Sequence, residues 1–457
     1  MLKLRRAIVL DAGPAGSGAE QELVIELTAP AGAQTGHRSG ARAHSPEDWV
    51  PDGFLGRHPA IADVALVGRA EVGDELVVNV QARDLGLGSG GFDIVHVNLT
   101  RGLNEDCPSG ANVMKLNYTS LQHTVEPVEE RFSADLKVGP LQRPVAVLAL
   151  HGQLAAVAWA FAQEHPGCRL GYVQTAGGAL PGGHSRTVRA LRERGLLAGH
   201  LTAGAAFGGE GEAITTIGAL NHGLRVLHWD AAVCGPGPGI VGSSSLLGHG
   251  GMSALDSAHA ALALGAPTLL VARMSSGDPR TRHRGISHHT LTVLDLLLAP
   301  VTVALPAGMR SPVGADLRAG LGAVFGGVLP SRPIENRGHT ARTTGSLELD
   351  VERPITDRPA RITRHDWRRA TVDLPAYAAA GLPAETMGRG LTEDPLFFGA
   401  ALAAGTTLAA LAVDVAGGED GAGEVRARGE DRGGMGEDRD EDATGGAERP
   451  VAPPRSR

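Results

Sequence analysis

Short apolar runs alternate with segments of helical spacing between Arg143 and Leu305 of this 457-residue chain. Runs such as VAVLAL (Val145–Leu150) and TLLVARM (Thr268–Met274) have the length and composition of buried strands. Six such strand candidates alternate with five helix candidates. The alternation predicts an α/β fold with a doubly wound, mostly parallel, Rossmann-like sheet that carries helices on both faces. Ligands of such sheets bind beyond the carboxyl ends of the strands.

The first hundred residues follow a different pattern, typical of β structure. Glu22–Leu27 and Glu75–Val80 are short runs rich in valine, isoleucine and leucine, and Phe92–Leu99 alternates apolar and polar residues. The pattern predicts an N-terminal small antiparallel β domain, either a barrel or a sandwich, over residues 1–100. The stretch Pro30–Pro59, rich in Gly, His, Ser and Arg, interrupts it and is interpreted as a long surface loop.

Four further segments complete the predicted domain organisation. Residues 101–142 connect the β domain to an α/β ligand-binding domain at 143–306, and residues 307–416 are expected to pack on that core. A final helix is expected after Asp394. Residues 417–457 carry 11 acidic residues and 7 arginines with few large apolar side chains. They are expected to be a disordered tail, because they cannot bury enough surface to offset the entropy of folding.

Composition argues against several classes of protein. Cys107, Cys168 and Cys234 form no CxxC pair, which disfavours a disulfide framework or a cysteine-based zinc site and favours a reducing cytoplasm. The longest apolar segment, Phe397–Val413, is rich in Ala, Gly and Thr and shorter than the ~20 residues of a membrane span, so no membrane association is expected. Lysine and aromatic residues are scarce and no RNA- or DNA-binding motif is visible, so nucleic acid is not an expected partner.

The segment most informative about function is DPRTRHRGISHHT (Asp278–Thr290), just after the predicted strand Thr268–Met274. It holds three arginines and three histidines in a chain of net charge −8, so the positive charge is local. Arginine can clamp phosphate or carboxylate, and histidine can transfer protons near neutral pH, which indicates a site for a small anionic metabolite. A solvated basic loop is the alternative interpretation of the same residues.

Each residue of this cationic segment has an expected role. His288 or His283 is the candidate general acid or base, Asp278 is a further catalytic candidate, and Ser287 is the expected N-cap of a helix that starts at His288. His288 and His289 are expected to point in different directions, so that only one faces a given ligand. A metal site made by Asp278, His283 and His288 lacks any HExxH or i,i+4 histidine pair, and no metal site is predicted. The arginines expected to bind the anion are Arg280, Arg282 and Arg284.

Three strand-to-helix loops are rich in glycine, namely Ala176–Gly183, Phe207–Gly211 and Gly235–Gly251. Glycines let the backbone approach a ligand and helix N-termini attract anions, so the loops predict a broad pocket. The third loop contains GxGxxG, but the next helix begins only near Ser253, which disfavours a nicotinamide and leaves the cofactor unknown. Asp230 is expected to face the crevice, paired with an arginine of the cationic segment, as a catalytic candidate. The remaining candidate ligand contacts are Thr175, Gly237, Gly239, Gly242, Ser244 and His249.

Four runs of the sequence are distinctive in combination: LNYTSLQHTVEPVE, DAAVCGPGPGIVGSSSLLGHGGMSALDSAHAALALG, TLLVARMSSGDPRTRHRGISHHTLTVL and TMGRGLTEDPLFFGAALAAG. Together they resemble an uncharacterised bacterial, mainly actinobacterial, family known as domain-of-unknown-function family 3866, over most of the chain up to about Val415. The chain departs from that family at Pro30–Pro59 and in the tail. The resemblance implies no particular activity. Because Gln174 stands where the family pattern places an acid, no catalytic role is expected at that position.

The resulting hypothesis is an enzyme, a hydrolase or a group transferase, that acts on a small anionic metabolite held by the glycine-rich loops and the cationic segment. The alternative is a non-catalytic ligand-binding or sensor module with the same pocket. The oligomeric state is not indicated by any feature of the sequence.

Overall fold

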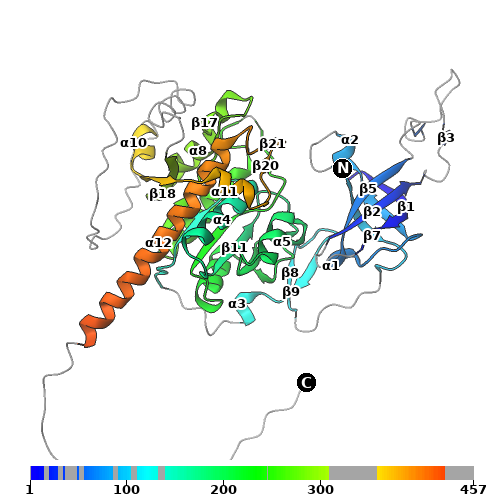
Figure 1. Ribbon diagram of the computed structural model, residues 1–457. Coiled ribbons are helices and arrows are strands. Elements are labelled where there is room, and N and C mark those ends of the chain that lie inside the picture. Colours follow the sequence, from blue (N-terminus) through cyan, green and yellow to red (C-terminus); the bar gives the residue numbers. More distant parts are fainter. Residues whose placement is uncertain are drawn as a thin grey trace, which may run out of the picture. The chain divides into compact units, whose positions relative to one another are not determined.

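The structure is a computed structural model with an N-terminal barrel and a larger α/β part (Figure 1). The residues that it describes are 2–14, 20–28, 34–35, 49–50, 56–85, 91–103, 111–131, 139–243, 245–307 and 358–427.

The α/β part is built on an eight-stranded sheet in which every neighbouring pair of strands is parallel. This confirms the predicted parallel sheet, and all six predicted strands are present. Two edge strands were not predicted, because GEA (β13) and DWRRAT (β19) lack the apolar run of a buried strand. The strands are β10 (Val145–Val147), β11 (Leu170–Thr175), β12 (Gly199–Ala203), β13 (Gly211–Ala213), β14 (Ala231–Pro236), β15 (Thr268–Leu270), β18 (Thr302–Ala307) and β19 (Asp366–Thr371).

Helices cover both faces of this sheet. Because successive strand residues point to opposite faces, Val145 and Val147 join one apolar cluster, which contains residues of α6, α7 and α8. Ala146 and Leu148 join a second cluster, which contains residues of α4, α5 and α12. The helices are α4 (Leu154–Glu164), α5 (Arg186–Glu193), α6 (Thr216–Asn221), α7 (Ser253–Ala263), α8 (His288–Leu296) and α12 (Pro395–Ala427).

The strand order determines where a crevice can open. The order is β13-β12-β11-β14-β10-β15-β18-β19, which differs from the 3-2-1-4-5-6 order of the dinucleotide-binding Rossmann sheet because β14 lies between β11 and β10. The chain leaves β10 toward one edge of the sheet, through α4, and leaves β14 toward the other edge, through α7. Ligands of open α/β sheets bind at the carboxyl ends of strands where the winding reverses in this way.

Trp229 is the largest fully buried side chain, and it requires glycines around it. A Cβ atom added at Gly171 would lie 1.9 Å from the indole ring, and one at Gly223 would lie 2.3 Å from it. We expect Gly171→Ala to lower the free energy of unfolding by roughly 1–3 kcal/mol through overpacking. Denaturant titration tests this, with Gly139→Ala as the control because its new Cβ would meet no atom closer than 3.7 Å. Equal stability of the two variants would contradict the prediction.

The N-terminal barrel is closed in the order β1-β2-β5-β7-β6. The prediction of an all-antiparallel domain is wrong in one pairing, because β5 and β7 run parallel. The chain passes from β5 to β6 through the short helix α1 (Val64–Val67), and β7 then returns between β6 and β5. Five-stranded closed barrels of this kind include the OB-fold, but a fold does not by itself imply a ligand. The strands are β1 (Leu4–Ala12), β2 (Glu20–Leu27), β5 (Arg57–Asp63), β6 (Glu75–Asn79) and β7 (Asp93–Asn98).

Much of the predicted surface loop at 30–59 lies outside the described residues. Within it β3 (Gln34–Thr35) pairs with β4 (Trp49–Val50), and its last residues belong to barrel strand β5. The remaining short elements are α2 (Gln81–Asp84), β8 (Val113–Lys115), β9 (His123–Val125), α3 (Val128–Arg131), β16 (Met274–Ser275), β17 (Gly285–Ile286), α10 (Arg358–Thr363), α11 (Leu374–Ala379), β20 (Glu385–Thr386) and β21 (Arg389–Gly390).

Helix α12 begins directly after Asp394, as predicted. Its segment Pro395–Val413 is long and apolar enough to cross a membrane, but 78% of it is buried inside the protein, as expected for a core helix. The helix continues to Ala427, into the segment predicted to be disordered. Extending an existing helix adds one hydrogen bond per residue without a new nucleation step, which sequence composition does not report. Residues 428–457 lie outside the described part of the chain.

Candidate functional site

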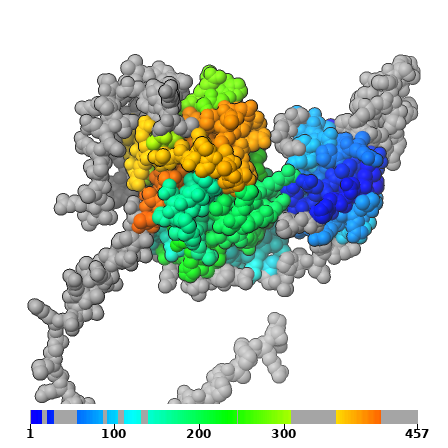
Figure 2. Space-filling model, in the orientation of Figure 1, coloured from blue at the N-terminus to red at the C-terminus, as the bar shows by residue number. Residues whose placement is uncertain are grey.

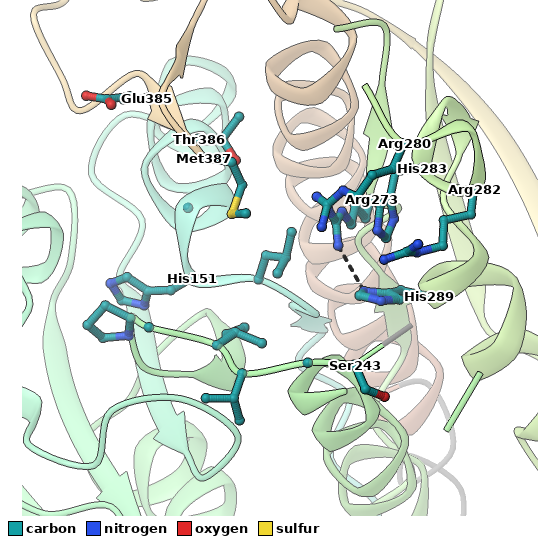
Figure 3. Close-up of a pocket in the computed structure, with 17 residues that line it drawn as sticks. His151, Ser243, Arg273, Arg280, Arg282, His283, His289, Glu385, Thr386 and Met387 are labelled. Atoms are coloured by element: carbon teal, nitrogen blue, oxygen red, sulfur yellow. Dashed lines mark hydrogen bonds between the residues drawn. The ribbon is translucent and has the colours of Figure 1, made fainter. Parts of the chain in front are cut away.

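A pocket of about 520 Å³ lies beyond the carboxyl ends of β10, β14 and β15, where the sheet winding reverses. Figure 3 shows Arg273, Arg282 and His289 on one side of it and His151 on the other. Residues 238–243 of the third glycine-rich loop form part of its wall. Residues 385–387 complete it, and Figure 2 shows the C-terminal residues (orange) on the surface of the α/β part. The pocket lies at the carboxyl edge of the sheet, which is where the sequence predicts a ligand site.

Several predicted site residues line this pocket. Its lining includes Gly239, Gly242, Arg280, Arg282 and His283. Gly239 has a φ of 72°, a left-handed conformation that glycine adopts without strain. The Nε atom of Arg282 is buried and has no hydrogen-bond partner among the described residues. A buried donor without a partner is costly, so this guanidinium is suited to bind an anion that enters the pocket.

The glycines of the first loop serve packing rather than ligand contact. A Cβ at Gly178 would lie 2.3 Å from the carbonyl oxygen of Gly237, and one at Gly237 would lie 2.4 Å from that of Ala179. These two loops therefore need glycine to approach each other, and Gly237 is absent from the pocket lining. The predicted broad pocket of three loops is wrong to this extent, because only residues of the third loop line it.

Two neighbouring polar residues also hold this loop in place. The Gln174 side-chain amide donates to the carbonyls of Ala179 and Leu180, at 3.2 and 3.3 Å. The Thr175 hydroxyl donates to the carbonyl of Ala176 at 3.3 Å, and it does not line the pocket. Thr175 is therefore placed as a loop contact rather than the predicted ligand contact.

The prediction for Asp230 is wrong. Asp230 immediately precedes β14, so it lies at the amino end of that strand, opposite to the end at which the pocket opens. Its carboxylate accepts a hydrogen bond of 2.7 Å from the backbone N–H of Arg169.

Arg284 is exposed, and its Nε donates to the backbone carbonyl of Asp278 at 2.9 Å. It also lies outside the pocket lining. Ser244 lies outside the described residues.

Asp278 organises the arginines instead of contacting the pocket. Its carboxylate is fully buried and accepts hydrogen bonds from Arg280 Nε and Nη2, at 2.9 and 2.8 Å. Arg389 Nη2 and Arg273 Nη2 lie 3.4 and 3.5 Å from its Oδ2. Burial acts to raise the pKa of this carboxyl, but the hydrogen bonds and charge of Arg280 outweigh it and hold the pKa well below its usual range. Such a carboxylate is a weak base, so Asp278, which was predicted as a catalytic candidate, positions the arginines instead.

A second carboxylate reaches this network from the C-terminal segment. Asp394 accepts hydrogen bonds from the Ser275 hydroxyl, at 2.6 Å, and from Arg389 Nε, at 3.2 Å. Three arginines, at 273, 280 and 389, therefore gather around two buried carboxylates, and Arg282 lines the adjoining pocket. Their excess of positive charge favours an anionic ligand in the adjoining pocket.

Beside these arginines lies a four-histidine cluster, formed by His249, His283, His288 and His289. The ring centroids of His249 and His289 are 3.5 Å apart, and those of His288 and His289 are 4.4 Å apart. Of His288 and His289 only the latter lines the pocket, as expected, but both rings belong to the cluster. Their side chains diverge by about 100° around the helix axis, but the cluster lies at the helix N-terminus, where both rings reach it. Ser287 is the N-cap, as predicted, and its hydroxyl accepts from the backbone N–H of His289.

The cluster is neutral at physiological pH. Burial, reinforced by nearby arginines and histidines, lowers the pKa of His283 to about 3 and that of His288 to about 4. It also lowers the pKa values of His249 and His289. A neutral imidazole accepts a proton or a cation, but it does not release its remaining N–H proton near neutral pH, so the assignment of His283 or His288 as general acid does not fit this environment.

His151, on the opposite wall, belongs to a buried polar group that was not predicted. Its Nε2 lies 2.7 Å from the Ser185 hydroxyl, and its Nδ1 lies 3.2 Å from both the Tyr172 hydroxyl and the Pro236 carbonyl. Ser185 is buried and N-caps α5 by accepting from the Val188 N–H, so this serine–histidine pair has a structural role.

Sequence reasoning missed Arg273, Arg389, Asp394 and the joint role of His249 with the two histidines of α8. Arg273 ended an apolar run and gave no local signal. Arg389 and Asp394 lie more than a hundred residues from Asp278 in the chain. The residues around Asp278 and around Arg389 belong to two of the distinctive sequence runs, and these two runs are in contact at the carboxylate–arginine network.

Residues 59–405 match the sequence profile of a family described as protein of unknown function (DUF3866). No curated protein and no solved structure matches the chain. The profile covers the last barrel strands, the whole parallel sheet, the pocket and the first part of α12. Since the match extends over well more than half of the sequence, this protein belongs to the DUF3866 family.

Proposed function

We propose that this protein is an enzyme, a hydrolase or a group transferase, whose substrate is a small anionic metabolite bound in the pocket at the sheet edge. The observation that carries the proposal is Arg282, whose buried Nε has no partner among the described residues and which lines a pocket of about 520 Å³. That volume suits a small metabolite.

Two further features support an anion. Arg273 and Arg280 line the same pocket and are oriented by Asp278, so their positions are set before a ligand arrives. Backbone of the glycine-rich loop at 238–243 is within reach of the ligand. Phosphate and carboxylate both match this chemistry, because a guanidinium binds either one through two parallel hydrogen bonds.

A non-catalytic binding or sensor module is the second candidate. It shares the pocket but needs no group that reacts. It is favoured by the environment of His283, which lines the pocket, because a pKa of about 3 makes this imidazole a weak base.

We expect Arg282→Ala to weaken anion binding by about 10–100-fold, because it removes a charge-assisted hydrogen bond of ~1.5–3 kcal/mol. The measurement is a thermal-shift screen of the full chain with inorganic phosphate, sugar phosphates, nucleotides and carboxylates. A ligand at about 100 times its Kd adds ~2.7 kcal/mol of stability. Arg284→Ala is the matched control, since Arg284 lies on the same segment but outside the pocket lining.

Stabilisation by one class of anion that is lost in Arg282→Ala and kept in Arg284→Ala is the expected result. The absence of any stabilising anion, or equal loss in both variants, would refute the pocket assignment. Incubation of the parent protein with the stabilising anion, followed by NMR, then separates the two candidates. Conversion of the anion supports the enzyme, and an unchanged bound anion supports the sensor module.

A further inference from the structure

Three histidines of the four-histidine cluster have ring nitrogens close to one another, and the rings of His249 and His289 are stacked face to face. One nitrogen from each of His249, His288 and His289 lies within 4.8 Å of those of the other two, and all three side chains are buried. Neither ring nitrogen of His288, which is only 2% exposed, has a hydrogen-bond partner in the described part of the chain.

The same is true of His249. Its two ring nitrogens make no hydrogen bond of normal geometry with any described residue, although the backbone of Leu246 is near enough to act on its pKa. Buried polar atoms in folded proteins are almost always hydrogen-bonded, so four unpartnered nitrogens on two adjacent rings require an explanation. A ligand that accepts lone pairs from several imidazoles at once is a metal ion.

The third ring is held by an arginine. Arg273 Nη1 lies 2.9 Å from His289 Nδ1 (dashed line in Figure 3), and since a guanidinium only donates, Nδ1 is the acceptor. An ion that binds at Nδ1 takes the same lone pair, and an ion that binds at Nε2 requires the ring proton to move to Nδ1. In both cases the hydrogen bond between Arg273 and His289 must break. The Arg273 guanidinium then keeps Asp278 as its partner, because Asp278 Oδ2 lies 3.5 Å from Arg273 Nη2.

We propose that His249, His288 and His289 form a binding site for a divalent transition metal ion, with Zn²⁺ as the ion that fits three imidazoles best. Each imidazole offers the lone pair of a ring nitrogen, which is the ligand that Zn²⁺ takes from histidine. Three histidines leave a fourth coordination position, and the cluster adjoins the proposed anion pocket, because His289 lines that pocket.

The metal site is inferred from the histidines alone and does not depend on the anion. If both proposals hold, they favour hydrolysis over group transfer, because Zn²⁺ in a three-histidine site lowers the pKa of a bound water to about 7 and so supplies a nucleophile at neutral pH.

The test is a titration of the full-length protein, purified without a polyhistidine tag and stripped with a chelator, with Co²⁺ in the absence of any added anion. We expect one equivalent to bind with the intense visible bands of a four-coordinate ion, and Zn²⁺ to displace it. His249→Gln and His288→Gln should each weaken binding by at least about 100-fold. His96→Gln, which changes a histidine of β7 in the barrel, should bind as the parent does. Circular dichroism establishes that each variant is folded.

Failure of the parent to bind Co²⁺ or Zn²⁺ at micromolar concentration would overturn the proposal. So would binding that shows only the weak bands of a six-coordinate ion, or that both folded cluster variants retain. These outcomes are read on the parent as well as on the variants, so a variant that does not fold leaves the test intact. They also leave the anion pocket untouched, because Arg282→Ala reports on it separately.

Discussion

Acidification from about pH 6.5 to about pH 4 should unfold this protein. Burial lowers the pKa of His151 to about 4, that of His200 to about 3 and that of His365 to about 4, against an ordinary value of 6.5. Between these values the unfolded chain binds a proton at each position and the folded chain does not, so stability falls as the pH falls. The loss is roughly 3 kcal/mol for each histidine, and the three together approach the ~5–15 kcal/mol stability of a typical domain.

The contacts of these rings show why the folded state resists protonation. His365 Nδ1 accepts a hydrogen bond of 3.1 Å from the backbone N–H of Val301, while its Nε2 lies 2.9 Å from the carbonyl of Leu294. A proton on Nδ1 would place two donors face to face. His200 is stacked on Tyr172, and its Nε2 has no partner among the described residues. A charge on either ring would therefore be buried without compensation.

Chemical denaturation at a series of pH values measures this effect. His200→Phe keeps the stacking on Tyr172 and removes one titrating group, so it should lower the slope of stability against pH by about 1.4 kcal/mol per pH unit below pH 6. The control is His228→Asn, because His228 is exposed and its left-handed φ of 53° is one that asparagine tolerates. A stability that does not change between pH 6.5 and 4, or a slope that His200→Phe leaves as it was, would contradict the prediction.

Replacing Asp278 with asparagine should lower the free energy of unfolding by about 3–5 kcal/mol. The substitution keeps the shape of the side chain but removes the charge that faces Arg273, Arg280 and Arg389. It leaves buried guanidinium groups without their counter-ion, and Arg273 is only 5% exposed. Anion affinity should change as well, because Arg280 and Arg273 lose the group that orients them toward the pocket.

The chain offers a matched control for this substitution. Asp366 pairs with Arg368 at 2.7 Å, with the same two-residue separation as Asp278 and Arg280. Both side chains of this pair are exposed, on edge strand β19. Exposed pairs contribute about 0–1 kcal/mol, so Asp366→Asn should have little effect. Denaturant unfolding of the two variants compares the loss of an aspartate charge from a buried ion pair with the same loss from an exposed ion pair. If Asp278→Asn is as stable as Asp366→Asn, the buried network does not stabilise the fold.

The parallel sheet was predictable because the sequence signal of each strand and helix lies within a few neighbouring residues. A buried strand and the helix that packs on it each have a characteristic hydrophobic period, and six strand signals alternate with five helix signals along the chain. The position of the cationic segment just after β15 followed from the same reading, and with it the edge of the sheet where the pocket opens.

The prediction for Asp230 failed because it depended on where a strand begins. The run Arg225–Cys234, before the third glycine-rich loop, predicts one strand, but residues 222–226 form a π-helix and β14 begins only at Ala231. Asp230 is therefore at the amino end of the strand, away from the pocket. A hydrophobic run does not show at which residue its strand begins and ends. The sequence therefore does not determine whether a polar residue near the boundary lies at the amino or the carboxyl end of the strand.

By itself, the sequence determined the α/β class, the order of strands and helices along the parallel sheet, the N-cap at Ser287 and the edge of the sheet where the pocket opens, because each depends on neighbours within a few residues. Only the tertiary structure decided which distant side chains meet. It joined His249 to His288 and His289, and it joined Asp278 to Arg389 across more than a hundred residues. Such contacts depend on packing of whole elements, which fixes the positions of side chains to within an ångström and which no local pattern contains.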